Sequence, residues 1–253
     1  MPMFSTDQHA LVTGGGRGIG RAVAAALSEA GARVTIVGRN RAVLEAAVTE
    51  GAAAAYAVAD VADEAALAAA VAEAAAVQPI SILVANAGAA ESAPFGRSDA
   101  ALFRRMIDIN LMGVVHAAQA VARPMAERKR GRIVAIASTA GLKGYPYVSA
   151  YCAAKHAVVG FVRALAVEMA ASGVTVNAVC PGFTDTDLVA ESVERIVQKT
   201  GRSRDEALAD LARHNPQGRL VTPAEVADAV LWLCSPGASA VTGQAIAVAG
   251  GEI

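Results

Sequence analysis

Short apolar runs alternate with longer segments of helical periodicity along the chain, and this order constrains the fold more than any other feature. The runs are rich in alanine and β-branched residues and carry few charges, as strands covered on both faces do. They predict strands at 9–13, 33–37, 53–58, 80–85, 132–137, 175–179 and 244–247. The segments between them predict helices at 17–30, 41–50, 64–76, 100–127, 150–172 and 223–234. Repeated strand–helix–strand units predict an α/β fold: a doubly wound parallel sheet of about seven strands with helices on both faces.

No linker rich in proline, glycine or serine divides the chain, so we expect residues 1–253 to form one domain. The least regular part is 183–218, which lies between the sixth predicted strand and a helix that begins with the capping box Thr222-Pro223-Ala224-Glu225. We expect residues 183–218, called the flap below, to form a mobile helical segment over a substrate site.

The composition excludes several classes of protein. Hydrophobic residues make up 55% of the chain, too many for a disordered protein. The net charge of −1 gives no basic excess for binding nucleic acid or an anionic membrane surface. No window approaches the ~20 strongly apolar residues of a membrane span, and the first residues lack a secretory signal pattern. Three cysteines without CxxC spacing and four histidines without ligand spacing predict no disulfide framework and no metal site, so we expect a cytoplasmic protein.

A glycine-rich turn follows the first predicted strand and leads into an alanine-rich helix. Gly14 allows a tight turn, Gly18 lets the backbone approach a pyrophosphate, and Gly20 allows the helix to pack closely on the strand. The N-terminus of the helix favours the anion. The turn therefore predicts a dinucleotide site, whose residues here are Gly14, Arg17, Gly18, Ile19 and Gly20.

The end of the second strand predicts which dinucleotide is used. An acidic side chain there would bind the ribose 2′-hydroxyl of NAD(H) and repel a 2′-phosphate, but Gly38 holds this position and Arg39 follows it. Arg39 and Arg17 supply two guanidinium groups for a phosphate with up to two negative charges. The sequence therefore favours NADP(H) over NAD(H), and the alternative is that Arg39 is a solvated surface residue.

Ser138 ends the fifth predicted strand, and Tyr151 and Lys155 follow on a predicted helix. A spacing of four places the tyrosine and the lysine on one helix face. An ammonium close to a phenol lowers the pKa of that phenol toward the range in which it exchanges a proton with an alcohol or carbonyl. Ser138 would hold the substrate oxygen. The pair alone is a weak signal, since Tyr151 as a half-buried packing residue is the usual alternative.

With the glycine turn, Asn86-Ala87-Gly88 and Ser138 in this order, the chain resembles a classical short-chain dehydrogenase/reductase over essentially its whole length. It is similar to the 3-oxoacyl reductase and 3-hydroxyacyl-CoA dehydrogenase branch. The resemblance implies a Rossmann fold, a homotetramer and reversible hydride transfer between a nicotinamide and a carbonyl carbon, without a metal. Tyr151 would then be the general acid/base, while Lys155 would bind the nicotinamide ribose.

The resemblance also implies roles for residues that residue type alone leaves open. Asn110 would perturb its helix and hold a water that links Lys155 to solvent, the alternative being a polar residue tolerated in a helix. Asp60 would face the adenine, with a helix N-cap as the alternative. The full set of further implied cofactor residues is Asp60, Val61, Asn86, Ala87, Gly88, Pro181, Gly182, Phe183, Thr184 and Thr186.

The predicted substrate residues are mainly apolar or aromatic: Ala90, Leu142, Tyr145, Val148, Phe183 and Leu188. Lys143 and the flap arginines Arg195, Arg202 and Arg204 form either a basic rim for an acidic carrier or solvated helix faces. An apolar pocket favours a 3-oxoacyl or 3-hydroxyacyl thioester or a similar ketone. Alternatives are an NAD-dependent secondary alcohol or hydroxysteroid dehydrogenase, a dinucleotide-sensing regulator without catalysis, and a scaffold protein.

Overall fold

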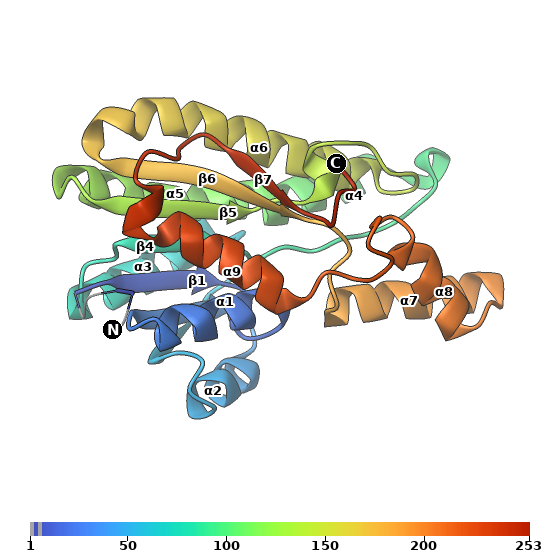
Figure 1. The fold of residues 1–253 in the computed structure, drawn as a ribbon, viewed down its shortest axis with the longest axis horizontal. Coiled ribbons are helices and arrows are strands. Elements are labelled where there is room, and N and C mark those ends of the chain that lie inside the picture. Colours follow the sequence, from blue (N-terminus) through green and yellow to red (C-terminus); the bar gives the residue numbers. More distant parts are fainter. Residues whose placement is uncertain (1–2, 5–6) are drawn as a thin grey trace.

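A computed structural model describes residues 3–4 and 7–253, and within them the strands form one seven-stranded parallel sheet (Figure 1). The spatial order is β3-β2-β1-β4-β5-β6-β7. The strands are β1 (His9–Thr13), β2 (Arg33–Gly38), β3 (Ala55–Val58), β4 (Ile82–Ala85), β5 (Gly131–Ile136), β6 (Val174–Pro181) and β7 (Ala245–Val248). The predicted strands are confirmed, with ends that move by one or two residues at most positions. The order reverses between β1 and β4, which defines a doubly wound sheet.

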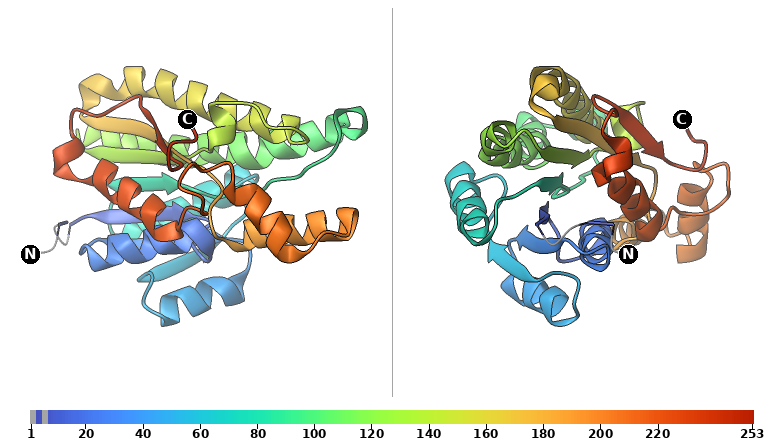
Figure 2. Two further views of the ribbon diagram at one scale, coloured as in Figure 1. Left: turned by 45° about the vertical axis from the view of Figure 1, so that its right-hand side comes forward. Right: turned by 60° about the vertical axis from the view of Figure 1, so that its left-hand side comes forward.

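Helices cover both faces of the sheet (Figure 2). On one face lie α1 (Gly18–Glu29), α2 (Arg41–Thr49) and α9 (Pro223–Cys234). On the other lie α3 (Glu64–Val77), α5 (Gly113–Glu127) and α6 (Ser149–Met169). Each layer buries an alanine- and valine-rich core against the central strands, whose side chains are buried on both faces. The predicted fold class is therefore confirmed, and α9 begins with the predicted capping box at Thr222 and Glu225.

The long helix predicted at 100–127 is interrupted. It consists of α4 (Ala100–Ile107), a π-helical turn over Asp108–Met112, and α5. The buried side chain of Asn110 donates to the carbonyl oxygens of Met106, at 3.0 Å, and Ala89, at 2.9 Å. These bonds compete with regular helical hydrogen bonding, which accounts for the wider turn.

The flap contains α7 (Asp187–Thr200) and α8 (Arg204–Ala212), which project from the carboxyl end of the sheet (Figure 1). Its two ends are joined by a parallel bridge between Thr184 and Val221. The backbone N–H of Val221 donates to the Phe183 carbonyl oxygen, and that of Asp185 donates to the Val221 carbonyl oxygen. The flap is therefore a pair of helices whose flanking segments are hydrogen-bonded to each other.

One helical stretch among the described residues, Ser149–Ser172, is long and apolar enough to cross a membrane by length and composition, which the sequence reading did not anticipate. This stretch contains α6, which packs on β6 and buries Val158 and Val162 in the core of its layer. The buried face accounts for part of its apolar character, since 44% of this stretch's most apolar window is buried, and core helices of soluble proteins are long and apolar enough in the same way.

Candidate active site

The strands β1, β4, β5 and β6 end at one edge of the sheet, and the segments that follow them carry the predicted site residues. Ligands of open α/β sheets bind at the carboxyl edge, where the strand order reverses. In this chain the reversal lies between β1, followed by the glycine turn, and β4, followed by Asn86. The fold therefore places the sequence motifs at the expected crevice.

The glycine turn has the shape of a phosphate cradle. Gly14 and Gly18 have φ angles of +66° and +53°, which side-chain-bearing residues rarely adopt. A Cβ at Gly20 would lie 2.2 Å from the Gly14 carbonyl oxygen, so close packing requires glycine there. Helix α1 begins at Gly18, next to Ile19, and its N-cap residue Arg17 makes no side-chain capping bond. A free helix start and a glycine cradle fit the pyrophosphate of a dinucleotide.

Asn86 and Ala87 connect β4 to β1. The Asn86 side-chain amide donates to the carbonyl oxygens of Thr13, at 3.0 Å, and Gly14, at 3.2 Å. The backbone N–H groups of Asn86 and Ala87 both donate to the Thr13 hydroxyl. Thr13 was not among the predicted site residues, although a threonine at the end of a predicted strand, directly before the glycine turn, was the available signal. These bonds fix the shape of the glycine turn.

The two arginines predicted to select the cofactor are exposed, and each lies beside a different carboxylate. Arg39 lies 3.7 Å from Asp60, and Arg17 lies 4.0 Å from Glu191 of the flap. Gly38 has ordinary space around its Cβ position, with Leu44 as its nearest neighbour at 3.4 Å. Exposed ion pairs of this kind contribute little stability, so an incoming phosphate can replace either carboxylate.

The N-cap alternative for Asp60 is wrong, because Asp63 caps α3 by accepting from the backbone N–H of Ala66. Asp60 instead accepts from the backbone N–H of Ala62 at 3.0 Å. Val61 is buried against the start of α5. The loop after β3 therefore leaves the Asp60 carboxylate partly exposed beside Arg39.

Ser138, Tyr151 and Lys155 lie together beyond the end of β5. Ser138 caps a 3-10 turn over Thr139–Gly141, where its hydroxyl oxygen accepts from the Ala140 backbone N–H at 3.1 Å. Tyr151 and Lys155 share a face of α6, with the lysine Nζ 5.7 Å from the centroid of the tyrosine ring. The Tyr151 hydroxyl faces the Ser138 side chain, which lowers the pKa of that hydroxyl.

Burial governs the protonation of this group. It raises the pKa of Tyr151 to about 12, although the hydrogen bond with Ser138 opposes this shift. It lowers the pKa of Lys155 to about 8. The lysine Nζ donates to the Ile136 carbonyl oxygen at 2.8 Å instead of to the phenol. The prediction that Lys155 lowers the pKa of Tyr151 is therefore wrong for this arrangement, because desolvation of the phenol is the largest effect.

Asn110 and Gly88 lie next to Lys155. A Cβ at Gly88 would lie 2.8 Å from Asn110 Oδ1 and 3.6 Å from Lys155 Nζ, so Gly88 separates the amide from the ammonium. The Asn110 Oδ1 accepts from the Ala89 backbone N–H at 3.3 Å. The structure therefore brings Asn110 to the lysine through the π-helical turn, and both the nitrogen and the oxygen of its amide bond the backbone.

The Pro181-Gly182 turn leads from β6 into the flap. The Thr184 hydroxyl donates to the Gly182 carbonyl oxygen at 3.0 Å and is buried, whereas the Thr186 hydroxyl donates to the Thr184 carbonyl oxygen at 3.2 Å. A Cβ at Gly18 would meet the Thr186 methyl group at 3.4 Å. The structure therefore places Thr186, and not Thr184, against the glycine turn.

The predicted substrate residues divide into an aromatic cluster and more peripheral positions. The rings of Tyr145 and Phe183 pack edge to face, 5.9 Å apart, and the His214 ring lies 5.7 Å and 5.2 Å from them. Ala90, Leu142 and Val148 are partly buried, and Leu188 is exposed at the start of α7. His214 and a buried carboxylate, Glu252, were not predicted, since no spacing near the C-terminus signals them.

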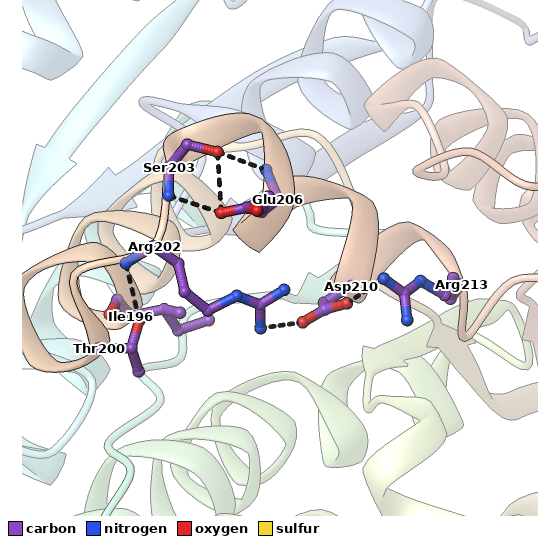
Figure 3. Close-up of polar contacts among 7 residues, drawn as sticks. All are labelled: Ile196, Thr200, Arg202, Ser203, Glu206, Asp210 and Arg213. Carbon is purple, nitrogen blue, oxygen red and sulfur yellow. Dashed lines mark hydrogen bonds and ion pairs between the residues drawn. The ribbon is translucent and has the colours of Figure 1, made fainter.

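The charged side chains of the predicted basic rim already have partners. Arg202 pairs with Asp210, which also pairs with Arg213 at 2.5 Å (Figure 3). Ser203 and Glu206 form a capping box at the start of α8 in the same picture. Arg204 pairs with Glu194, Arg195 donates to the Glu191 carbonyl oxygen, and Lys143 pairs with Glu252 at 3.0 Å. Among the flap arginines, Arg204 therefore links α8 to α7, Arg202 holds the connecting loop to α8, and Arg195 bonds within α7.

Comparison with known proteins agrees with this geometry. The family model described as short chain dehydrogenase matches residues 8–196. A galactitol 2-dehydrogenase (L-tagatose-forming) of Cereibacter sphaeroides is 40% identical over 96% of this chain and 93% of its own length. A 3-oxoacyl-[acyl-carrier-protein] reductase of Chlamydia trachomatis is 35% identical over 97% of both chains. A crystal structure of a variant actinorhodin polyketide ketoreductase with NADPH superposes with a TM-score of 0.94 and 38% identity, covering 98% of this chain and 99% of the other.

This chain belongs to the classical short-chain dehydrogenase/reductase family. It is an oxidoreductase that acts on CH–OH groups with a nicotinamide dinucleotide.

Proposed function

We propose that this enzyme is an NADP(H)-dependent ketoreductase that acts on a 3-oxoacyl thioester or a similar apolar ketone. The observation that carries the proposal is the pairing of Ser138 with Tyr151, with the Lys155 ammonium beside the ring, at the carboxyl edge that also holds the glycine turn. The apolar and aromatic lining around Tyr145 and Phe183 supports the substrate class. The names of relatives that reduce 3-oxoacyl groups or polyketides support it further.

The bound nicotinamide would supply or accept a hydride at the substrate carbon. In reduction, the Tyr151 hydroxyl donates its proton to the carbonyl oxygen, and the Ser138 hydroxyl holds that oxygen. A pKa of about 12 keeps Tyr151 protonated at neutral pH, which suits a proton donor. Lys155 would bind the nicotinamide ribose. Asn110, whose side chain lies near the Lys155 ammonium on the other side of Gly88, would hold a water that returns the proton from solvent.

NADP(H) is supported by the two exposed guanidinium groups of Arg17 and Arg39 beside the uncharged Gly38. The residues proposed to contact the cofactor are those at the carboxyl edge: Gly14, Arg17, Gly18, Ile19, Gly20, Arg39, Asp60, Val61, Asn86, Ala87, Gly88, Tyr151, Lys155, Pro181, Gly182, Phe183, Thr184 and Thr186. A neighbouring crystal structure described with NADPH is in keeping with this choice.

The whole chain would act as one domain, with the flap as a substrate cover and the pocket lined by Ala90, Leu142, Tyr145, Val148, Phe183 and Leu188. A homotetramer is supported by exposed apolar residues on two helices, Val167 on α6 and Trp232 on α9, which are 81% and 46% exposed. The three cysteines are buried and free, in keeping with a reducing cytoplasm. Sedimentation that shows a monomer would contradict the tetramer.

A second candidate is an NAD-dependent secondary alcohol dehydrogenase that takes a free, uncharged substrate. It is favoured by the pairing of Lys143 with Glu252, of Arg202 with Asp210 and of Arg204 with Glu194, since these pairs neutralise three of the four side chains of the predicted basic rim. The galactitol 2-dehydrogenase relative is named for a free, uncharged polyol substrate.

A substrate panel followed by nicotinamide absorbance tests the proposal. The panel contains 3-oxoacyl thioesters and aryl ketones with NADPH or NADH, and secondary alcohols with the oxidised cofactors. Fastest turnover of an apolar ketone with NADPH is expected. A clear preference for secondary alcohols with NAD⁺ would favour the second candidate, and cofactor binding without any turnover would favour a dinucleotide-sensing regulator.

A further inference from the structure

The side chain of Glu252, one residue before the C-terminus of this sequence, is buried, with only 2% of its surface exposed. Carboxylates are rarely buried unless they are paired, because removing a charge from water is costly. Glu252 lies at the carboxyl edge of the sheet, where a Cβ at Gly182 would come within 3.1 Å of its Oε2. A buried acid at this edge calls for a physical explanation beyond packing.

Three side chains from two other segments converge on one oxygen of Glu252. Its Oε1 accepts from the Tyr145 hydroxyl at 2.5 Å and pairs with Lys143 Nζ at 3.0 Å. The Nδ1 of His214, at the end of the flap, lies 3.8 Å away. The Lys143 ammonium also lies 5.0 Å from the centroid of the Tyr145 ring. Glu252 therefore joins the loop before α6 to the segment that follows α8.

The backbone of the tail supports this connection. Gly250 has a φ of +61°, and a Cβ there would lie 1.9 Å from Asn215 Oδ1, so the tail packs directly on the residue after His214. Gly251 has a φ of +93° and approaches Pro216. Residues 249–252, called the C-terminal tail here, thus touch the flap at successive positions and end with Glu252 in the buried position.

These contacts determine how Tyr145 is presented. Its hydroxyl donates to Glu252 and accepts from the Thr139 hydroxyl at 2.7 Å, so its donor and its acceptor are both occupied inside the protein. Its ring packs edge to face against Phe183, and both rings contact His214. The cluster of Tyr145, Phe183 and His214 is called the aromatic wall here. Its position therefore depends on a fourth residue, Glu252, which contacts both Tyr145 and His214.

We propose that Glu252 is a positioning residue for the reaction: its carboxylate anchors Tyr145 and the end of the flap, and so fixes the aromatic wall against which the apolar part of the substrate packs. The proposal rests on the proposed function for the identity of the substrate side. It adds a C-terminal carboxylate, far in sequence from Ser138, Tyr151 and Lys155, as a determinant of substrate affinity.

The substitutions Glu252→Gln and Glu252→Ala test the anchor, with Glu73→Gln as a matched control. Glu73 is exposed on α3, so the same chemical change there leaves the aromatic wall untouched. Glutamine keeps an oxygen that accepts from the Tyr145 hydroxyl but loses the charge that pairs with Lys143. Alanine removes both interactions, and each lost bond to a buried charged group is a large effect.

The first measurement is amide hydrogen exchange, which needs no substrate. The reporters are hydrogen-bonded amides on the two anchored segments: Lys143, whose N–H donates to the Thr139 carbonyl oxygen, and Gln217, whose N–H donates to Asn215 Oδ1. We expect these amides to exchange at least about tenfold faster in Glu252→Ala, less in Glu252→Gln, and unchanged in Glu73→Gln. Amides of β1 and β4 should exchange as in the wild type.

The second measurement is steady-state kinetics on the ketone with the fastest wild-type turnover. We expect KM for the ketone to rise at least about tenfold in Glu252→Ala and by a smaller factor in Glu252→Gln, while the NADPH KM and kcat stay within about threefold. Unchanged exchange in both Glu252 variants overturns the anchor. Faster exchange with an unchanged ketone KM, or an equal rise in the NADPH KM, overturns the positioning role. If the wild type turns over no carbonyl substrate, the proposed function fails, and the exchange data alone decide whether Glu252 anchors the two segments.

Discussion

Substitution of Arg39 by leucine is the sharpest test of the cofactor assignment, because the structure allows its effect to be estimated. The Arg39 side chain is 73% exposed. Among the described residues it forms one ion pair, with Asp60 at 3.7 Å. A hydrogen bond to a charged group contributes about 1.5–3 kcal/mol. Exposure favours the lower end of that range, since solvent screens the interaction. About 1.5 kcal/mol corresponds to roughly a tenfold change in kcat/KM.

We therefore expect Arg39→Leu to lower kcat/KM for NADPH about tenfold and to change that for NADH less than twofold. The assay compares both cofactors at constant ionic strength, because exposed charges are screened by salt. Arg41→Leu is the matched control, since Arg41 lies on α2 and hydrogen-bonds to Tyr56. An equal fall for both cofactors, or a wild-type preference for NADH, would refute the reasoning.

Two other substitutions probe the site from different directions. Gly20→Ala places a Cβ 2.2 Å from the Gly14 carbonyl oxygen, so we expect lower NADPH affinity and a free energy of unfolding in urea that is lower by about 1–3 kcal/mol. The control Gly160→Ala, with nothing within 4 Å of its Cβ position, should not destabilise the protein. Equal effects of the two substitutions would refute the packing argument. Lys155→Met should be more stable than the wild type at pH 7, by about 1–3 kcal/mol, because burial holds the pKa of Lys155 at about 8. Between pH 8 and 10.5 the unfolded wild type binds more protons than the folded one, so this gap should narrow as the pH rises; a gap independent of pH would contradict the pKa shift.

The sheet and its motifs were predictable because their signals are local. A buried parallel strand reads as a short apolar run, and the glycine turn after β1 must have glycine at positions 14 and 20 for steric reasons that need no knowledge of the rest of the fold. The spacing of Tyr151 and Lys155 likewise places them on one helix face. The relation of these motifs to one another then follows from the parallel sheet, whose carboxyl ends share an edge.

The parts that could not be predicted depend on contacts between distant segments. The pKa of Tyr151 is set by burial, which a spacing of four residues does not reveal. The partners of Lys143 and Arg202 come from the tail and from α8, so their charges could not be assigned to a basic rim or to internal pairs from sequence alone. His214 and Glu252 meet Tyr145 only because the tail and the flap end side by side.

The central claim, that Tyr151 transfers the proton in a hydride-transfer reaction, is tested most directly by Tyr151→Phe. This change removes the hydroxyl that faces Ser138 and keeps the ring beside Lys155. General acid–base catalysis contributes about 10²–10⁴-fold, so kcat for the ketone substrate should fall by that factor while the NADPH dissociation constant, from fluorescence titration, stays within twofold. A variant that keeps more than about a tenth of wild-type kcat would contradict the assigned role.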